Sequence, residues 1–225
     1  LIIRSDKVTA EVLEAAKQLK IVVRAGAGYD NVDLAAATTK NVVVMNTPGQ
    51  NSNAVAELAL GLMIFMARNK YTPGTGTELQ GKTLAIHAYG NVGKLVGRKG
   101  KALGMNVIAY DLYPNESGRA IADYVTQDEL FAKADVISLH CNLTPENAGL
   151  INRENIAKMK DGVHLVNCAR GGLVDEQALA DALRDAGVDV AVLANNHCCD
   201  GGAAGVHTTV AELGRCGILH TGVFT

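Results

Sequence analysis

A short glycine-containing segment between two regular elements is the part of the sequence best suited to bind a ligand. It follows an apolar run at 84–87, typical of a strand, and precedes a helix expected over 92–103. In such a turn the backbone approaches a pyrophosphate closely, and amides at the helix N-terminus hold its negative charge. The pattern therefore predicts a dinucleotide site. The turn residues expected to contact the cofactor are Ala88, Gly90, Asn91, Val92 and Gly93.

Two single positions refine this prediction. Ala88 stands where dinucleotide-binding turns usually carry glycine, so we expect its backbone to avoid positive φ. An ordinary strand–helix turn would show the same glycines, because the short motif is common by chance. Asp111 closes the next apolar run, 107–110, where an acidic residue binds the adenosine ribose hydroxyls. A carboxylate there repels a 2′-phosphate, which favours NAD over NADP as the cofactor.

Short apolar runs alternate with helix-like segments along most of the chain, and this arrangement would position such a turn. The expected strands are 1–4, 21–24, 42–45, 84–87, 107–110, 136–139, 163–166 and 188–193. The expected helices are 10–19, 53–68, 92–103, 127–133, 153–159 and 176–185. Thr126 with Glu129 forms a capping box before one helix, and Asp175 caps another. The alternation predicts an α/β fold with a parallel sheet covered on both faces.

Composition excludes several other classes of protein. Hydrophobic residues make up 48% of the 225 residues, the formal net charge is −2, and aromatic residues reach only 4%. No basic block or cationic amphipathic face is present, so neither nucleic acid nor a membrane is expected as a partner. The longest apolar run, 58–67, falls short of the roughly 20 residues of a membrane span. Five irregularly spaced cysteines fit the reducing cytoplasm.

Two changes in composition divide the chain. Residues 71–82 (YTPGTGTELQGK) are rich in Gly and Thr, which suits a linker. The sequence after Ala194 is rich in Gly, Cys and His instead. We therefore expect three parts, 1–70, 71–193 and 194–225. Because the chain opens at Leu1 inside a strand-like run, we expect its natural N-terminus to be missing.

Six segments, in order along residues 1–185, carry a family resemblance. They are IRSDKVTAEVLEAA, RAGAGYDNVDLAAAT, VVVMNTPGQNSNAVAELALG, HAYGNVGKLVG, DVISLHCNLTPENAGLI and VHLVNCARGGLVDEQAL. Together they resemble the D-isomer-specific 2-hydroxyacid dehydrogenases, and they are especially similar to the 3-phosphoglycerate dehydrogenases of that family. The resemblance implies two Rossmann-like or flavodoxin-like parallel-sheet domains with the active site between them. Residues 1–70 would be an incomplete substrate domain, 71–193 the NAD-binding domain and 194–225 an atypical tail.

The resemblance assigns substrate roles to residues near the ends of several strands. Arg170, in NCARGG, matches the catalytic arginine, whose guanidinium binds the substrate carboxylate and polarises the carbonyl that accepts hydride. The AGAGY loop would offer the Ala27 and Gly28 amides to the same carboxylate as an anion nest. Arg4 matches an arginine that reaches the substrate phosphate, and Arg24 would assist it. Taken singly, each would be an ordinary surface or loop residue.

Further matched residues at the ends of two strands would contact the cofactor. They are His140, Cys141, Asn142, Cys168 and Ala169. The first three would pass beneath the adenosine or nicotinamide ribose, and the last two would lie near the nicotinamide. The family usually has proline where Asn142 stands. Hydride transfer needs no thiol nucleophile, so Cys168 is interpreted as a small buried residue.

Beyond residue 185 the family pattern stops. The family takes its proton-transferring histidine and the supporting carboxylate from the segment after the last strand, which should carry DVF-type and TPH-type motifs. Ala194 stands where the aspartate belongs, and neither motif follows. No role is transferred to His197, His207 or His220. The acid–base partner of the hydride site is therefore expected to be absent.

The last part of the chain resembles a different family. The stretch from residue 183 onward is similar to poly-gamma-glutamate capsule synthesis proteins, which relate to metallophosphoesterases. Asn196, His197 and Asp200 match their metal-site positions, but the required upstream carboxylates are not recognisable. Cys198 and Cys199 lack zinc-site spacing, so no metal is expected and a mobile Gly-rich tail is preferred. A natural fusion or a mis-assembled reading frame would explain the junction.

Three functions from different classes follow from these features. We expect an NAD-dependent oxidoreductase of a small 2-hydroxy acid, by resemblance D-3-phosphoglycerate in serine biosynthesis, acting in the cytoplasm as a homo-oligomer. The first alternative is a catalytically inactive nucleotide-binding or dimerisation module, in which helix 53–68 packs across a subunit surface. The second is a metal-dependent hydrolase fragment from the tail. Turnover of a hydroxy acid separates the first two, and chelator-sensitive phosphoesterase activity would support the third.

Overall fold

The computed structural model describes residues 1–185, 190–192 and 202–221. The chain forms two compact units, Leu1–Ala54 and Val55–Thr225. The division falls just inside helix α3 (Ser52–Ala67), whereas the sequence suggested a boundary in the linker at 71–82. The observed division and the expected boundary differ because Ala56, Ala59 and Met63 of α3 are fully buried in the core of the second unit. α3 therefore belongs with the sheet that follows it.

The first unit is a three-stranded parallel sheet with two short helices. Its elements are β1 (Ile2–Ile3), α1 (Ala10–Ala15), β2 (Ile21–Arg24), α2 (Leu34–Thr39) and β3 (Val43–Asn46), and the strand order is β1-β2-β3. Thr9 and Asp33 cap the two helices through their side-chain oxygens. α1 is shorter than the expected helix 10–19 because the chain turns after Ala15, and Leu19 packs onto the core from that turn.

The second unit is built around a five-stranded parallel sheet. The strands are β4 (Thr83–His87), β5 (Asn106–Tyr110), β6 (Asp123–Tyr124), β7 (Val136–Leu139) and β8 (His164–Asn167). Their order, β6-β5-β4-β7-β8, shows that the chain first builds outward on one side of β4 and then on the other. Ligands of such sheets bind outside the carboxyl ends of the strands at this switch point. The predicted α/β fold with parallel sheets is confirmed, although β6 was not predicted.

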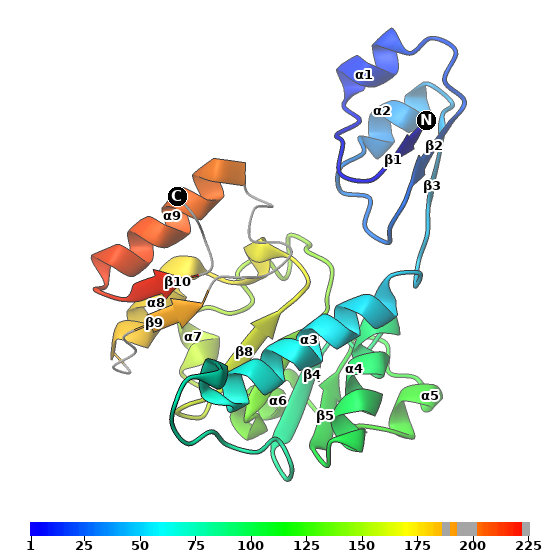
Figure 1. Cartoon of the computed structure of the whole chain (residues 1–225). Coiled ribbons are helices and arrows are strands. Elements are labelled where there is room, and N and C mark those ends of the chain that lie inside the picture. The colour runs from blue at the N-terminus through cyan, green and yellow to red at the C-terminus, as the bar shows by residue number, and fades with distance from the viewer. Residues whose placement is uncertain (186–189, 193–201, 222–225) are drawn as a thin grey trace. The chain divides into compact units, whose positions relative to one another are not determined.

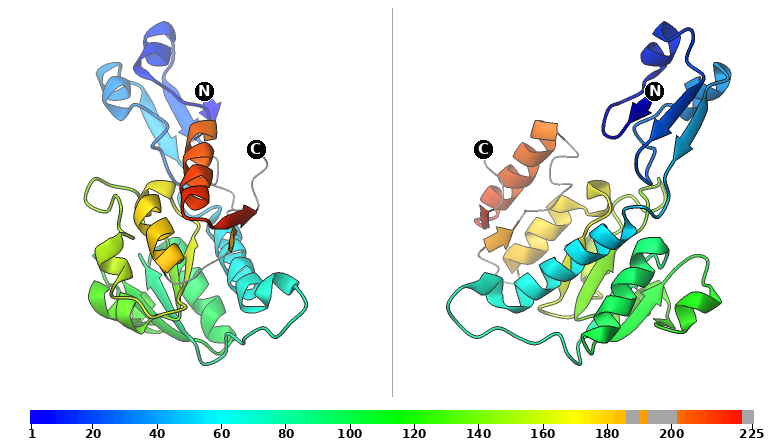
Figure 2. Two further views of the ribbon diagram at one scale, coloured as in Figure 1. Left: turned by 90° about the vertical axis from the view of Figure 1, so that its left-hand side faces the viewer. Right: turned by 45° about the vertical axis from the view of Figure 1, so that its right-hand side comes forward.

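Helices cover both faces of this sheet (Figure 1 and Figure 2). On one face, α3 and α4 (Asn91–Ala102) share a core with Leu84 and Ile86 of β4. On the other, α6 (Gln127–Lys133) and α7 (Arg153–Ile156) share a core with Ala85. Alternate β4 side chains therefore enter opposite cores, and β7 is buried along its whole length. The capping box predicted before α6 is present.

The chain after β8 also belongs to the second unit. It forms a turn of 3₁₀ helix, η2 (Gly171–Leu173), and α8 (Glu176–Asp185), which Asp175 caps as predicted. β9 (Val190–Val192) pairs in parallel with β10 (Leu219–Thr221), and α9 (Gly202–Arg215) contacts α8. Leu213 and Cys216 share a small core with Ala180, and Arg215 binds Asp181 at 2.8 Å. The described residues of the expected loose tail are thus tied to α8.

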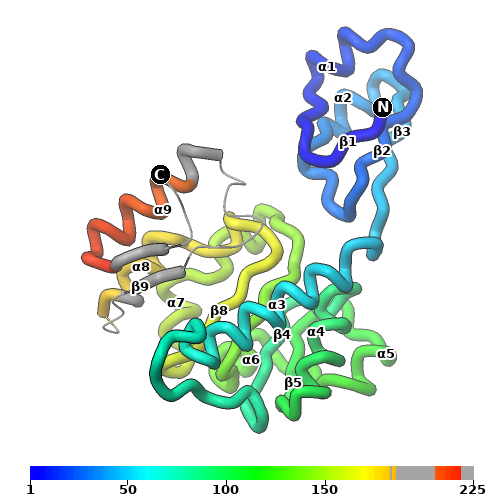
Figure 3. The backbone as a smooth tube through the Cα atoms, viewed as in Figure 1, coloured from blue at the N-terminus to red at the C-terminus, as the bar shows by residue number. Residues whose placement is uncertain are grey.

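Six further elements were also not predicted: α2, η1 (Asn69–Tyr71), α5 (Glu116–Arg119), η2, α9 and β10. From η1 the backbone follows a long irregular path to β4 (Figure 3). Among the residues that the structure describes, no helix is both long enough and apolar enough to cross a membrane.

Candidate functional site

The predicted glycine turn joins the carboxyl end of β4 to the amino end of α4. Gly90 is the N-cap of the helix, and a Cβ built on it would meet no atom of the described residues within 4 Å. A Cβ on Gly93 would instead collide with the carbonyl oxygen of Ala88 and crowd Ile86. The turn therefore has free space next to Gly90, whereas at Gly93 the helix packs tightly against the end of β4. This is the geometry that lets a phosphate approach helix amides while the helix stays close to its strand.

Ala88 adopts φ of 72°, so the expectation that its backbone avoids positive φ was wrong. Its N–H donates to the carbonyl oxygen of Tyr110 at 2.9 Å, which continues the β4–β5 pairing into the turn. A left-handed conformation costs a non-glycine residue roughly 1–2 kcal/mol. The sheet hydrogen bond and the packing of α4 impose this conformation on an alanine. Local preference is overridden here by tertiary structure.

Asp111, directly after β5, lies against the glycine turn. Its Oδ2 accepts a hydrogen bond from the backbone N–H of Tyr89 at 2.6 Å, and its Oδ1 accepts one from Tyr113 N–H at 2.8 Å. The carboxylate is thereby fixed at the switch-point edge of the sheet, partly exposed. An ionised carboxylate has about four acceptor positions, so two stay available for other donors. Asp111 and the turn were both predicted from the sequence, but the contact between them was not.

Tyr89, between Ala88 and Gly90, packs its side chain into the core that α3 and α4 share with β4. Its side chain is fully buried, and burial raises the pKa of its hydroxyl to about 12. The hydroxyl oxygen has no hydrogen-bond partner in the described part of the chain. A Cβ on Gly97 would collide with this hydroxyl, so α4 needs a residue without a side chain where it contacts the ring. Sequence reasoning missed Tyr89; an aromatic residue inside a motif of small residues was the available signal.

His87, the last residue of β4, is also buried. Its ring lies 5.1 Å from that of Tyr110 and 6.4 Å from that of Phe131. Among the residues that the structure describes, neither ring nitrogen has a well-formed hydrogen-bond partner. Burial lowers the pKa of His87 to about 4, although the Gln127 side chain and the Asp111 charge oppose the shift. The imidazole is therefore neutral at pH 7. His87 was not predicted as a site residue, and its polarity in an apolar strand was the available signal.

The end of β7 contributes the predicted residues His140, Cys141 and Asn142. The ring Nε2 of His140 lies 2.9 Å from Oγ of the buried Ser138, and burial lowers the pKa of His140 to about 4. Burial raises the pKa of the Cys141 thiol to about 11, so it is protonated at pH 7. The carbonyl oxygen of Asn142 accepts from Asn147 Nδ2 at 2.6 Å, which fixes the loop beyond the strand.

The end of β8 contributes Cys168, Ala169 and Arg170. Cys168 is buried, and burial raises the pKa of its thiol to about 11. Asn167 accepts from the N–H of Ala169 at 3.0 Å and donates to the carbonyl oxygen of Arg170 at 2.8 Å. The Arg170 guanidinium donates to the Ala169 carbonyl oxygen at 2.9 Å and is half-buried. Asn167, which the sequence argument missed, thus shapes the loop that carries Arg170.

The carboxyl edge of the second sheet therefore gathers residues from four strand ends. The turn after β4, Asp111 after β5, His140 after β7 and Arg170 after β8 all lie at this edge, on either side of the switch point between β4 and β7. Seen by itself, the second unit presents an open anion-binding turn, a carboxylate, neutral histidines and an arginine. This set suits a dinucleotide and a carboxylate substrate.

In the first unit, the predicted substrate residues lie at the carboxyl edge of the smaller sheet. Arg24 Nε donates to the carbonyl oxygen of Arg4 at 3.1 Å, and Asn46 Nδ2 donates to that of Ala27 at 2.7 Å. Arg4 and Ala27 are exposed, and Gly28 is partly exposed. Three strand ends are thereby brought together in one local cluster of this unit.

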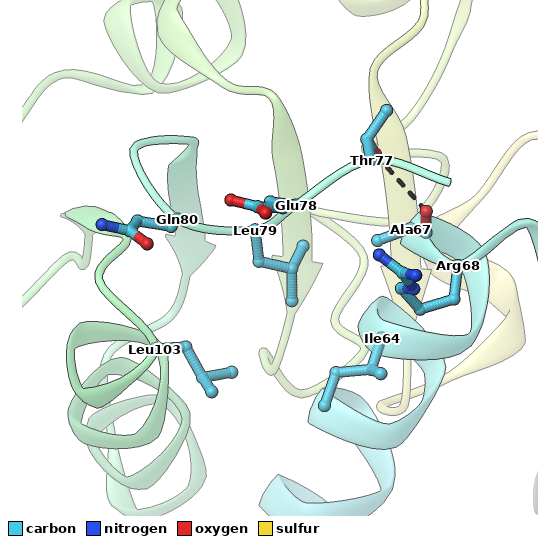
Figure 4. Close-up of a pocket in the computed structure, with 8 residues that line it drawn as sticks. All are labelled: Ile64, Ala67, Arg68, Thr77, Glu78, Leu79, Gln80 and Leu103. Carbon is cyan, nitrogen blue, oxygen red and sulfur yellow. Dashed lines mark hydrogen bonds between the residues drawn. The ribbon is translucent and has the colours of Figure 1, made fainter. Parts of the chain in front are cut away.

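A hollow of about 320 Å³ lies at the opposite, amino edge of the second sheet (Figure 4). It is bounded by Ile64 of α3, by Arg68 directly after that helix, by the segment before β4 that carries Leu79, and by Leu103 after α4. None of the predicted site residues lines this hollow. It is separate from the carboxyl edge, where a parallel sheet binds its ligand.

No metal site is formed by the residues that the structure describes, since no three His, Cys, Asp or Glu side chains among them are placed to hold an ion. His207 is exposed on α9. The remaining candidates of the tail lie outside the described residues: Ala194, Asn196, His197, Cys198, Cys199 and Asp200.

Known proteins match this chain in sequence and in structure. A family model for the D-isomer specific 2-hydroxyacid dehydrogenase, NAD binding domain, matches residues 61–194. Hydroxypyruvate reductase of Thermotoga maritima is 47% identical over 193 residues, covering 80% of this chain and 63% of that protein. D-3-phosphoglycerate dehydrogenase of Methanocaldococcus jannaschii is 44% identical over 210 residues, covering 86% and 40%. NAD⁺-bound 3-phosphoglycerate dehydrogenase of Entamoeba histolytica superposes with a TM-score of 0.80 at 37% identity, covering 99% and 70%.

The matched region contains the glycine turn, Asp111 and Arg170, and it makes up more than half of the chain. The alignments span only 63% and 40% of the two sequence relatives. Fold, local geometry and sequence agree on one assignment: the chain belongs to the D-isomer-specific 2-hydroxyacid dehydrogenase family, and residues 61–194 match the NAD-binding domain of that family.

Proposed function

We propose that this protein is an NAD-dependent oxidoreductase of a small 2-hydroxy acid. One observation carries the proposal: the Asp111 carboxylate lies 2.6 Å from the N–H of Tyr89, inside the turn that is open above Gly90. The two halves of an adenosine diphosphate site, an anion-binding turn and a ribose-binding carboxylate, are therefore adjacent.

The residues present fit the cofactor. Gly90 leaves room where a side chain would block the pyrophosphate, and α4 is long enough for its N-terminal amides to attract a negative charge. The two acceptor positions of Asp111 that the described residues leave unused would receive the ribose hydroxyls. When bound, the nicotinamide supplies the acceptor or donor of hydride.

Arg170 would bind the substrate. Asn167 holds its backbone in place, so the guanidinium is presented from the end of β8. A planar guanidinium binds a carboxylate through two parallel hydrogen bonds, and its charge stabilises the oxygen of the reacting carbonyl as negative charge develops there. Arg4 and the amides of Ala27 and Gly28 in the first unit would bind further anionic groups of the substrate.

Within this class we propose D-3-phosphoglycerate as the substrate. The support is the name of the relatives from M. jannaschii and E. histolytica, together with Arg4 as a phosphate partner. The T. maritima relative is named a hydroxypyruvate reductase, so hydroxypyruvate is the competing substrate. By the family resemblance, we propose a homo-oligomer as the working form.

A second candidate is a protein that binds NAD without turnover. Both histidines at the carboxyl edge of the second sheet, His87 and His140, have a pKa lowered to about 4. A general acid–base catalyst works best when its pKa lies near the working pH. Neither histidine meets that condition at pH 7, and no histidine of this sequence matches the one that the family uses for proton transfer, which favours binding without efficient proton transfer.

Calorimetry and assays of the purified chain separate these possibilities. NADH should bind the wild-type protein, and Asp111→Arg should weaken that binding at least about tenfold because the ribose acceptor is lost. Turnover of 3-phosphoglycerate with NAD, at higher kcat/KM than the reduction of hydroxypyruvate, would support the proposed enzyme. Binding without any turnover would support the second candidate. A folded protein that binds no NADH would refute both.

A further inference from the structure

We infer that Ser138 is a positioning residue that holds the His140 ring with its proton on Nδ1, so that this N–H is offered to an oxygen of the bound dinucleotide. The inference rests on the proposed NAD-binding function and adds to it a residue inside the sheet. Ser138 does not itself reach the carboxyl edge; it acts through His140.

Ser138 is the polar exception in a strand that is otherwise apolar. β7 lies between β4 and β8, all four of its residues are buried, and Ser138 is fully inaccessible to solvent. A hydroxyl in such a place needs a hydrogen-bond partner. Its Oγ lies 2.9 Å from Nε2 of His140, two residues further on, where the side chain projects from the same face.

The direction of this hydrogen bond follows from the donors available. The hydroxyl has one hydrogen to donate, and among the described residues Nε2 of His140 is its acceptor. If Nε2 carried the ring proton instead, the buried serine O–H would be left without an acceptor, at a cost that natural structures avoid. Ser138 therefore donates and Nε2 accepts.

The ring proton of neutral His140 must then be on Nδ1. Burial lowers the pKa of His140, so the imidazole is neutral at pH 7. In the described part of the chain no group accepts a hydrogen bond from Nδ1 of His140. This nitrogen is also not among the buried polar atoms that lack a partner, whereas both ring nitrogens of His87 are. Nδ1 of His140 is therefore a donor that solvent or a ligand can reach.

The backbone of His140 lies beside the glycine turn of the proposed cofactor site. Its backbone N–H donates to the carbonyl oxygen of His87 at 2.9 Å, which ties the first residue after β7 to the last residue of β4. The glycine turn begins one residue later, at Ala88. An N–H at this point complements a sugar hydroxyl or phosphate oxygen, and a ring of fixed tautomer cannot present an acceptor there instead.

Nitrogen-15 NMR of histidine-labelled protein and NADH calorimetry test the inference together. In the wild type at pH 7 we expect His140 to show a protonated Nδ1 and an unprotonated Nε2. Ser138→Ala should give a mixture of tautomers and weaken NADH binding about fivefold, the value of one hydrogen bond. Ser138→Thr, which keeps the hydroxyl, should restore both. Ser117→Ala removes an exposed serine hydroxyl from α5 and is the matched control.

A double-mutant cycle with His140→Ala isolates the coupling. If Ser138 acts through His140, Ser138→Ala should cost no further affinity once the ring is gone. NADH affinity unchanged in Ser138→Ala, or a wild-type His140 with its proton on Nε2, would overturn the inference and leave the proposed function intact. Absence of NADH binding in the wild type would refute the proposed function and the inference with it. The wild-type spectrum decides the tautomer even if Ser138→Ala does not fold.

Discussion

The backbone N–H of Tyr89 donates to Oδ2 of Asp111 at 2.6 Å and so joins the glycine turn after β4 to the end of β5. The two groups directly follow adjacent parallel strands, and the last residues of these strands, His87 and Tyr110, are paired. One carboxylate therefore stabilises the apoprotein and, in our proposal, also receives the ribose. Its substitution should separate these two roles.

Replacing Asp111 by alanine should lower both stability and cofactor affinity. Tyr89 is fully buried, so its N–H would lose its partner, and we expect the free energy of unfolding to fall by about 1–3 kcal/mol. Asp111→Asn keeps one acceptor oxygen and should retain most of the stability while still weakening NADH binding. Urea denaturation and calorimetry measure the two effects. Asp123→Ala, at an exposed position of β6, is the control and should change neither.

Replacing Ala88 by glycine should stabilise the protein. The backbone at this position has φ of 72°, which glycine adopts without strain, so we expect a gain of about 1 kcal/mol. Ala102→Gly, at the exposed end of α4, should instead lose up to about 1 kcal/mol. Thermal denaturation of the two variants measures both effects, and the same substitution should raise stability at position 88 and lower it at position 102. A loss of stability in Ala88→Gly would contradict the strained turn.

Adding a methyl group at Gly93 should displace α4 from β4. The new Cβ would collide with the carbonyl oxygen of Ala88, so Gly93→Ala should destabilise the second unit by about 1–3 kcal/mol and weaken NADH binding. Gly61→Ala places the same group on an exposed face of α3, where it meets no atom within 4 Å. That control should be neutral or stabilising by up to about 1 kcal/mol. Equal effects of the two substitutions would argue against tight helix–strand packing.

Buried His87 should make stability depend on pH below neutrality. Its pKa is about 4 in the folded protein and 6.5 ordinarily, so the unfolded chain takes up its proton first as the pH falls. Neutral, buried His87 therefore makes its full contribution to the free energy of unfolding above pH 6.5. This contribution, about 3 kcal/mol, is lost as the pH falls from 6.5 to 4. His87→Ile should remove this share of the acid destabilisation, whereas exposed His207→Ala should not. Urea midpoints at pH 7 and 4.5 measure the difference.

Most of the second unit could be predicted because its buried parallel strands are short runs of apolar residues. β7 was predicted at its observed limits, and the caps Thr126 and Asp175 were recognised from local rules. β6 has only two residues and α5 only four, too few for any periodicity to mark them. The compact units divide at Ala54 and Val55 and not in the linker, because the packing of α3 on a later sheet is not visible in the linker composition.

The site was predicted at the level of strand ends and missed at the level of contacts. The motif identified the turn and Asp111, but the Tyr89–Asp111 hydrogen bond depends on how two strands pair. The φ of Ala88 was predicted with the wrong sign because tertiary packing overrides the preference of an isolated alanine. Ser138 and Asn167 act through local hydrogen bonds, which a residue type alone does not reveal.

Titration of the purified wild-type protein with NADH and NADPH in parallel tests the central claim most directly. With Asp111 against the glycine turn, we expect one NADH per chain and at least about tenfold weaker binding of NADPH, whose 2′-phosphate would face the carboxylate. A folded protein that binds neither dinucleotide, or binds both equally well, would contradict the account.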